Sequence, residues 1–412
     1  MSLNIGQIAD TSTRAVCSML VVLVVGILFA YFKKIDMQGL SSVGQAISYL
    51  YVPAILFYSF AKGLSVDVFE GGGWMLIVLG AVTMPLSTLM AYPFMRVGQT
   101  PDWFQRWFLF GCTFQNTVAM PLVLIQTICS QIDFAKSNTT TNEFLTSEEC
   151  IAKAQTYLFL YIFVNGLMFW VVAYDIMPSK FDKTVEPTTT ATTDAEVATS
   201  IEIREAEAVV LEEETSPSLL KRMRWLIIHV ASLCLRPPII AQLVGTLVGL
   251  VPALQDLFFA PNAYLSPLTV CVKIFADAST AVTNLSMACS LGLQICQLTS
   301  MRHLFGGDAR GLSIRTTAAF VLCRMLAIPG GLFACIYGMS QLGWFPAHDR
   351  LLLLTAYMVS ATPSANMCVV VPQLLGNHRA SGALGLLLLG QYLVAIPSLL
   401  LWLSLAFYLT SP

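Results

Sequence analysis

The stretch SATPSANMCVVVPQLLG, residues Ser360 to Gly376, places two helix breakers and an amide side chain inside a strongly apolar part of the chain. Pro363 and Pro372 flank Asn366. Proline removes a backbone donor and displaces the carbonyl four residues earlier. In lipid, such non-helical backbone survives only where protein buries it or where it lines a wet cavity. If the chain crosses a membrane, this stretch is therefore predicted to form half of a binding site.

The composition is that of a membrane protein. Of 412 residues, 56% are hydrophobic and 11% are charged, whereas a soluble domain carries about 25% charged residues. A bilayer-spanning helix needs about 20 mostly apolar residues. Ten such runs are predicted, and the first is interpreted as a retained helix because it lacks a signal-peptide cleavage pattern. The runs cover residues 15–32, 43–62, 74–95, 107–130, 155–177, 225–250, 265–296, 313–338, 351–375 and 383–409.

The positive charges predict the orientation, because cytoplasmic loops collect Lys and Arg. With the N-terminus outside, the inside loops hold 14 of the 22 Lys and Arg residues, the outside loops hold 5, and 3 fall within apolar runs. This distribution predicts that both termini lie outside. The loop after the fourth run then lies outside too, and it contains the glycosylation sequon at Asn138. Cys129 and Cys150 bracket this loop, and the sequence leaves open whether they form a disulfide.

A polar segment divides the chain. Residues 179–222 are rich in Thr, Glu and Pro and nearly free of aromatic residues, so they cannot bury enough apolar surface to fold as a core. We interpret them as a cytoplasmic linker, a solvated tether more than a regulatory element, between five-helix repeats at 1–178 and 223–412. An odd number of helices per half inverts the second half, which is the pattern of inverted-repeat transporters.

The two halves share a matching defect. The fourth run reads FGCTFQNTVAMPLVLIQT, with Asn116 followed by Pro121, and the ninth has Asn366 followed by Pro372. Two opposed breaks would direct half-helix ends and two amides at one point. We therefore expect a substrate site at these residues together with Gln115 and Pro363. The alternative is simple kinking, since prolines occur in other apolar runs, at Pro53, Pro85, Pro329 and Pro397.

At these residues the chain resembles the auxin efflux carrier family, and the PIN-LIKES branch more than the long-loop carriers. The stretches that carry the resemblance span nearly the whole chain outside the linker. They are YLYVPAILFYSFAKGLS (49–65), FQNTVAMPLVLIQ (114–126), ADASTAVTNLSMACSLGLQI (276–295), RMLAIPGGL (324–332), SATPSANMCVVVPQLL (360–375) and LLGQYLVAIPSLLLW (388–402).

The resemblance implies a ten-helix fold in which helices four and nine cross at their prolines. Helices 1, 2, 6 and 7 would form a scaffold that could pair in a homodimer, and the other helices would move. The implied cargo is an organic anion, auxin-like or another monocarboxylate. The endoplasmic reticulum is the membrane expected for the PIN-LIKES branch, followed by the plasma membrane.

Ionisable groups inside apolar runs are functional hypotheses, normally with a partner. Lys273 and Asp277 lie four residues apart and can pair on one helical face. That pair is either a structural lock or a site of proton exchange. Arg324 either attracts an anion into the cavity or snorkels toward the cytoplasmic headgroups near Arg315.

Two amides occupy comparable places in the two halves. Asn165 in the fifth run and Gln391 in the tenth either line the same cavity or bond between helices.

Other functions have weaker support. The chain lacks the nucleophile elbow, the zinc-protease pair and the phosphate-binding loop that mark common enzymes, so no catalysis, cofactor, metal or nucleic-acid partner is predicted. A proton- or sodium-coupled exchanger of similar architecture and a transporter-derived sensor remain alternatives. Exchangers use carboxylates at the crossing, and the fourth and ninth runs contain none, which favours an anionic cargo.

Overall fold

The structure is a computed structural model that describes residues 5–64, 68–131, 145–175, 177, 235–260, 262–296, 312–346 and 349–410. The chain divides into two compact units: one comprises Met1–Ser179 and Pro237–Pro412, and the other comprises Lys180–Arg236. Of the second unit, only Leu235 and Arg236 are described. The described residues are helical, apart from one isolated β-bridge and short connections. The linker therefore lies outside the described residues, and its predicted role as a tether stays a prediction.

The first half of the chain contains α1 (Ile5–Tyr31), α2 (Met37–Ala46), α3 (Val52–Gly63), α5 (Trp74–Val97), α6 (Asp102–Thr113), α7 (Ala119–Gln131) and α8 (Ser147–Asp175). The second half contains α11 (Pro237–Leu250), α12 (Pro252–Phe259), α13 (Ser266–Cys296), α15 (Ile314–Leu322), α16 (Ile328–Gln341), α17 (Arg350–Ser360), α18 (Met367–Leu374) and α19 (His378–Thr410). Among the described residues there are three π-helical turns: η1 (Ile47–Tyr51) between α2 and α3, η2 (Phe69–Gly73) directly before α5, and η3 (Cys323–Ala327) between α15 and α16.

Several of these helices are long and apolar enough to cross a membrane. Within the described residues there are five, at Gln38–Gly63, Gly71–Val97, Ser147–Val172, Ser266–Ser290 and Ile314–Gln341. Two bent pairs, α11 with α12 at 105° and the two parts of α19 at 56°, give up to seven if each pair counts as one span. An all-α, multi-span protein is thus confirmed, whereas the count of ten spans and the inverted repeats stay predictions.

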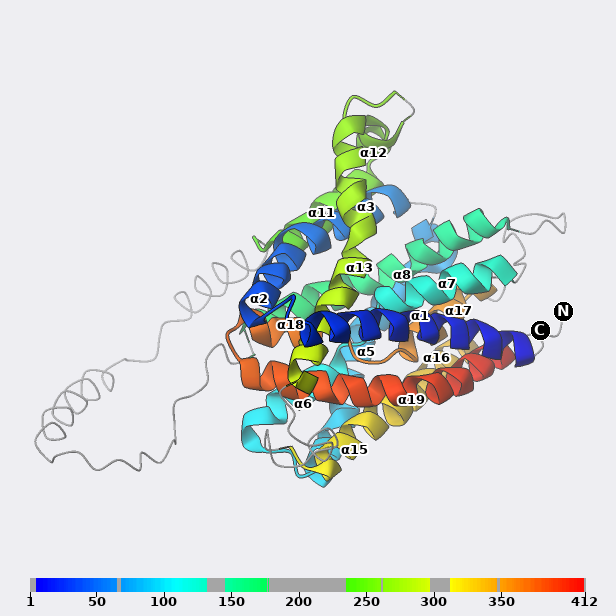
Figure 1. Cartoon of the computed structure of the whole chain (residues 1–412). Helices are drawn as coiled ribbons and strands as arrows, with labels where there is room; N and C mark the ends of the chain where they lie inside the picture. The colour runs from blue at the N-terminus through cyan, green and yellow to red at the C-terminus, as the bar shows by residue number, and fades with distance from the viewer. Residues whose placement is uncertain are drawn as a thin grey trace, which may run out of the picture. The chain divides into compact units, whose positions relative to one another are not determined.

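One group of helices, which comprises α1, α3, α11 and α13, packs through small residues. In it, α1 packs on α13, and α3 packs on both α11 and α13 (Figure 1). A Cβ added at Gly249 of α11 would lie 2.4 Å from the Phe60 carbonyl oxygen, and one added at Gly26 of α1 would lie 2.2 Å from the Ala288 Cβ. Only glycine permits such close backbones, which is a common device of membrane helices.

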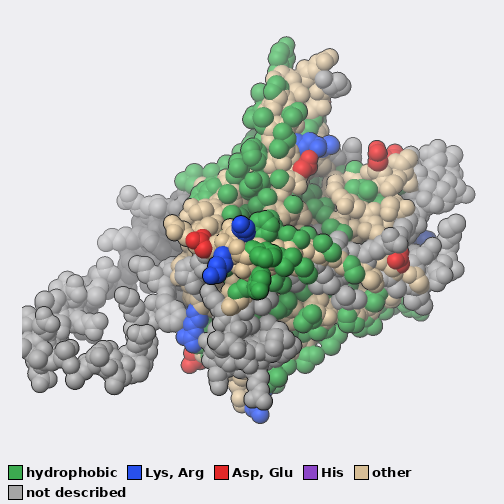
Figure 2. Space-filling view, in the orientation of Figure 1, with side chains coloured by type: hydrophobic (Ala, Val, Ile, Leu, Met, Phe, Trp, Pro, Cys, Tyr) green, Lys and Arg blue, Asp and Glu red, His purple; other side chains and the backbone are tan. Residues whose placement is uncertain are grey.

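The second group, α5 to α8 with α15 to α19, encloses a core of large side chains. There α5 packs on α6 and α8, and α17 packs on α8 and α19. The largest buried side chains include Trp107, Phe108, Phe114, Tyr161 and Phe320. On the outside, apolar side chains dominate the visible helical surface and charged ones are few (Figure 2).

The turn η3 shows how this core tolerates proline. Pro329 cannot donate to the carbonyl four residues earlier, that of Met325. That carbonyl instead accepts from the Ser398 hydroxyl at 2.8 Å and from the Trp402 indole N–H at 2.9 Å. The helix therefore continues through the proline and presents Arg324 to the interior.

Candidate substrate site at two facing helix breaks

Two helices are interrupted inside the bundle, and the interruptions lie against each other. The first separates α6 from α7 at residues 114–118, and the second separates α17 from α18 at residues 361–366. The Asn116 N–H donates to the Pro363 carbonyl at 2.7 Å, and the Ala365 N–H donates to the Phe114 carbonyl at 2.9 Å. This short antiparallel pair satisfies backbone groups that lipid could not satisfy.

The three prolines that were expected at the site occupy different positions relative to the two breaks. Pro363 lies in the second break and pairs with the first. Pro121 is near the start of α7, where a missing N–H costs little because first-turn N–H groups have no intrahelical partner. Pro372 lies inside α18, after the break. The structure thus corrects the expectation that Pro372 interrupts the helix.

Arg324 contacts both of the facing breaks, and its side chain is 0% exposed. Its guanidinium donates to the Cys112 carbonyl at 3.3 Å, to the Thr362 carbonyl at 2.7 Å and to Gln115 Oε1 at 3.0 Å. One side chain thereby joins the end of α6 to both breaks. The alternative that Arg324 snorkels toward Arg315 and the headgroups is wrong, because these hydrogen bonds hold its charged end inside the protein.

Gln391 of α19 fastens the second break from another side. Its Oε1 accepts from the Ser364 N–H, and its Nε2 donates to the Ser364 hydroxyl, both at 3.0 Å. It does not line the cavity described below. Of the two alternatives for Gln391, the structure favours bonding between segments.

Asn116 and Asn366, the asparagines of the two breaks, each interact with other side chains or backbone groups of the protein. Asn366 accepts from the Tyr392 hydroxyl at 2.6 Å and donates to Asn284 Oδ1 of α13 at 2.7 Å. The Asn116 side chain also interacts with the Tyr392 hydroxyl, and its Oδ1 accepts from the Met120 N–H at 3.4 Å. Tyr392 therefore connects the asparagines of the two halves.

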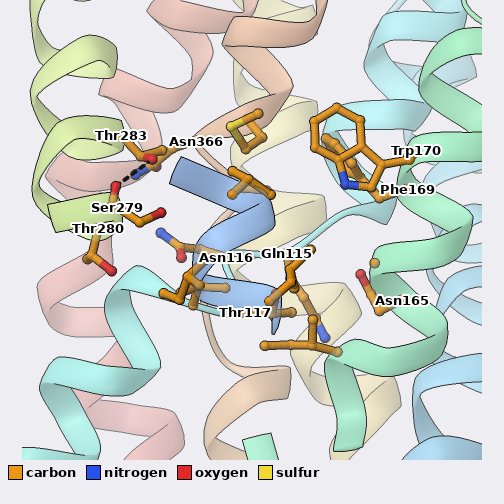
Figure 3. Close-up of a pocket in the computed structure, with 18 residues that line it drawn as sticks. Gln115, Asn116, Thr117, Asn165, Phe169, Trp170, Ser279, Thr280, Thr283 and Asn366 are labelled. Carbon is orange, nitrogen blue, oxygen red and sulfur yellow. Dashed lines mark hydrogen bonds between the residues drawn. The ribbon is translucent and has the colours of Figure 1, made fainter. Parts of the chain in front are cut away.

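A cavity of about 130 Å³ lies beside the two facing breaks. In Figure 3, α13 with its hydroxyl side chains is on one side of the labelled residues, and α8 with its aromatic side chains is on the other. None of its 18 lining residues is charged. The polar lining comprises Gln115, Asn116, Thr117, Asn165, Ser279, Thr280, Thr283 and Asn366. The apolar lining comprises Val52, Ile55, Leu56, Val118, Ile162, Phe169, Trp170, Ala365 and Met367, and Gly166 of α8 completes it.

Asn165 is a buried donor without a hydrogen bond. Its side chain is 5% exposed, and its Nδ2 has no hydrogen-bond partner. The Tyr161 hydroxyl interacts with this side chain outside hydrogen-bond geometry, and it also accepts from Gln115 Nε2 and pairs with the Thr83 hydroxyl at 2.9 Å. Because buried donors are normally paired, this amide is a candidate contact for a ligand.

Lys273 and Asp277 pair as predicted, with Nζ and Oδ2 2.7 Å apart. Their side chains are 51% and 62% exposed on α13, however. The expectation that this pair is buried is therefore wrong, because it lies on an outward face of the helix. Neither residue lines the cavity.

The loop between α7 and α8 is described at its two edges. Cys129 and Cys150 form a disulfide with their Cα atoms 5.7 Å apart, which joins the end of α7 to the start of α8. Asn138 lies outside the described residues, so its glycosylation stays a prediction.

Several polar contributors to the cavity were not predicted from the sequence. Ser279, Thr280 and Thr283 project from one face of α13 into the cavity, and the small-residue run DASTAVTN was the available signal. An ion pair between Lys153 and Asp349, at 2.7 Å, was also not predicted, and it ties α8 to the start of α17. No group of three or more metal-ligating side chains occurs in the part of the chain that the structure describes.

The chain belongs to the family described as "Membrane transport protein", the auxin efflux carrier family, whose sequence model matches residues 11–403. This confirms the resemblance and, with the apolar helices, identifies an integral, multi-pass membrane protein of a transporter family rather than an enzyme family.

Three curated relatives are PIN-LIKES proteins of Arabidopsis thaliana. PIN-LIKES 2 is 21% identical over 94% of this chain and 92% of its own length. PIN-LIKES 5 is 19% identical over 92% of this chain and 91% of its own length. PIN-LIKES 6 is 24% identical over 41% of this chain and 36% of its own length.

Proposed function

We propose that the protein is a secondary carrier that moves a small organic anion across a membrane by alternating access at the two facing breaks. The observation that carries the proposal is the convergence of both breaks on one cavity. Asn116 and Asn366, one from each half of the chain, line that cavity together with the unpaired amide of Asn165.

The chemistry of the cavity suits an anion. The residues directly before α7 and the first residue of α18 contribute to its lining, and helix N-termini favour anions through their exposed N–H groups and positive dipole. The lining has no carboxylate, the side chain that balances the charge of a bound cation, and this favours an anionic cargo. Neutral amide donors also allow release, because no ion pair with the cargo has to be broken.

The rest of the lining suits a small apolar body. Phe169 and Trp170 of α8 and the aliphatic side chains of α3 offer apolar surface, and binding sites for small molecules commonly combine such surface with a few placed polar groups. A monocarboxylate with a compact aromatic or aliphatic body fits this description.

Alternating access needs two groups of helices that can move against each other. We propose that α1, α3, α11 and α13 form a scaffold and that the helices around the crossing move, within ten spans arranged as two inverted repeats. The packing groups described above support this division. The start of α1 and the end of α19 lie at the same end of the molecule (Figure 1), as an even number of spans requires. Homodimerisation through the scaffold and residence in the endoplasmic reticulum belong to the same proposal.

The test is uptake of radiolabelled monocarboxylates into proteoliposomes, with and without a pH gradient, beside the uncharged amide of each acid. We expect uptake of at least one acid by the wild type. Asn116→Ala and Asn366→Ala should each weaken its binding about 10- to 150-fold, the worth of one hydrogen bond to a charged group. Gln126→Ala, at an exposed position of α7, is the control and should change nothing. Absence of uptake for every acid, or normal affinity in both asparagine variants, would refute the proposal.

A further inference from the structure

Arg324 is a buried charge without a counter-charge. It is 0% exposed, and its three hydrogen-bond acceptors are two carbonyls and an amide oxygen. No carboxylate pairs with it among the described residues. Buried ions in proteins are normally paired, because leaving water costs several kcal/mol per ion. The missing counter-charge therefore has to be explained by the other groups that come close to Arg324.

The surroundings of Arg324 leave its charge intact. The ionisable groups near it are the thiols of Cys112, Cys323 and Cys368 and the hydroxyl of Tyr161. Thiols and phenols are neutral in such apolar surroundings, and a guanidinium stays protonated in proteins. The region behind the crossing therefore carries a permanent net charge of about +1.

One side chain separates this charge from the cavity. Gln115 lines the cavity, and its Oε1 accepts from Arg324 Nη2 at 3.0 Å. Its Nε2 donates to the Tyr161 hydroxyl. The amide is thus fixed at both ends, and the guanidinium stands directly behind it without entering the cavity.

We propose that Arg324 determines the charge of the cargo: its guanidinium, placed behind Gln115, makes the uncharged cavity selective for a monoanion that it never touches. The proposal rests on the proposed function. A bound carboxylate supplies the missing counter-charge through space, while contacts with the cargo stay with neutral amides and hydroxyls. Arg324 is in this sense a positioning and specificity-determining residue.

The expected size of the effect follows from Coulomb's law. At a separation of about 8 Å and an effective dielectric constant of about 20, one unit charge changes the affinity for an anion by roughly 30-fold. The affinity for a neutral molecule of the same shape should change far less. The ratio of the two affinities therefore isolates the charge from any structural effect of a substitution.

The test uses phenylacetate and phenylacetamide as probes, which differ in charge but hardly in shape. Binding of both to the purified full-length protein is measured by titration calorimetry, with thermal stability in parallel. Arg324→Gln should lose about 10- to 50-fold in affinity for phenylacetate and little for phenylacetamide. Arg324→Lys keeps the charge and should keep the preference for phenylacetate. Arg96→Gln, at an exposed position on α5, is the matched control.

A second pair of variants covers the case in which Arg324→Gln does not fold. Cys368 lies beside Arg324 in the first turn of α18 and does not line the cavity. Cys368→Asp places a counter-charge there, and acidic residues are favourable at helix starts. Cys368→Asn has the same shape without the charge. The preference for phenylacetate should fall at least tenfold in Cys368→Asp relative to Cys368→Asn.

The outcomes separate the two proposals. A wild type that binds no carboxylate would overturn the carrier proposal and the role of Arg324 together. A wild type that prefers phenylacetate, with the same preference in folded Arg324→Gln or in Cys368→Asp, would overturn only the role of Arg324. Equal binding of both probes by folded Arg324→Lys would do the same.

Discussion

Replacing Asn165 with leucine should separate binding from stability. Leucine has the same branching and the same number of heavy atoms as asparagine but no polar atoms. The Asn165 Nδ2 is buried without a partner, and such a group costs about 1–3 kcal/mol in desolvation. Asn165→Leu should therefore leave the free energy of unfolding unchanged or raise it by up to that amount.

The same substitution should weaken binding. If the cargo's carboxylate accepts from this amide, its loss removes a hydrogen bond to a charged group, worth about 1.5–3 kcal/mol. This corresponds to a loss of affinity of about 10- to 150-fold. Gln391→Leu is the opposite control, because Gln391 makes two hydrogen bonds to Ser364 and does not line the cavity. It should destabilise the protein.

The assay combines titration of a transported monocarboxylate with thermal unfolding of the same purified variants in detergent. The expected pattern is weaker binding with equal or higher stability in Asn165→Leu, and lower stability in Gln391→Leu. A destabilised Asn165→Leu that binds normally would show that the amide has a structural role, and the reasoning from its missing partner would fail.

Three further predictions concern the outside of the molecule. Endoglycosidase should shift the mobility of the native protein and Asn138→Gln should abolish the shift, whereas a tag at residue 195 that is reached from outside would contradict the topology. Replacing Cys129 and Cys150 with serine should lower the free energy of unfolding by about 3 kcal/mol, the loop-closure value for a separation of 21 residues, and denaturation with and without reductant measures it. The Lys273–Asp277 pair is more than half exposed, so changing both residues to leucine should alter the free energy of unfolding by less than about 1 kcal/mol and preserve uptake. Loss of uptake in a folded double variant would instead favour proton exchange.

Much of the candidate site could be predicted from sequence. Asn116 and Asn366 were recognised because an amide followed by a proline is unusual at membrane depth and occurs in both halves, and the structure places both in one cavity. The contribution of α13 was missed, because serine and threonine in an apolar helix can also bond to their own backbone, as Thr283 does to the Ser279 carbonyl at 2.8 Å. Such residues identify a cavity only when neighbouring helices are known.

The sequence by itself determined that this is a helical membrane protein and which transporter family it belongs to. Hydrophobic run length and proline chemistry are local properties, and they can be deduced without a fold. Only the tertiary structure decided that the second break lies at Pro363, that Arg324 is locked inside and that the Lys273–Asp277 pair faces outward. Each of these depends on which distant segment satisfies a carbonyl or a charge. Such partners, like Thr362 for Arg324, are set by packing across the bundle.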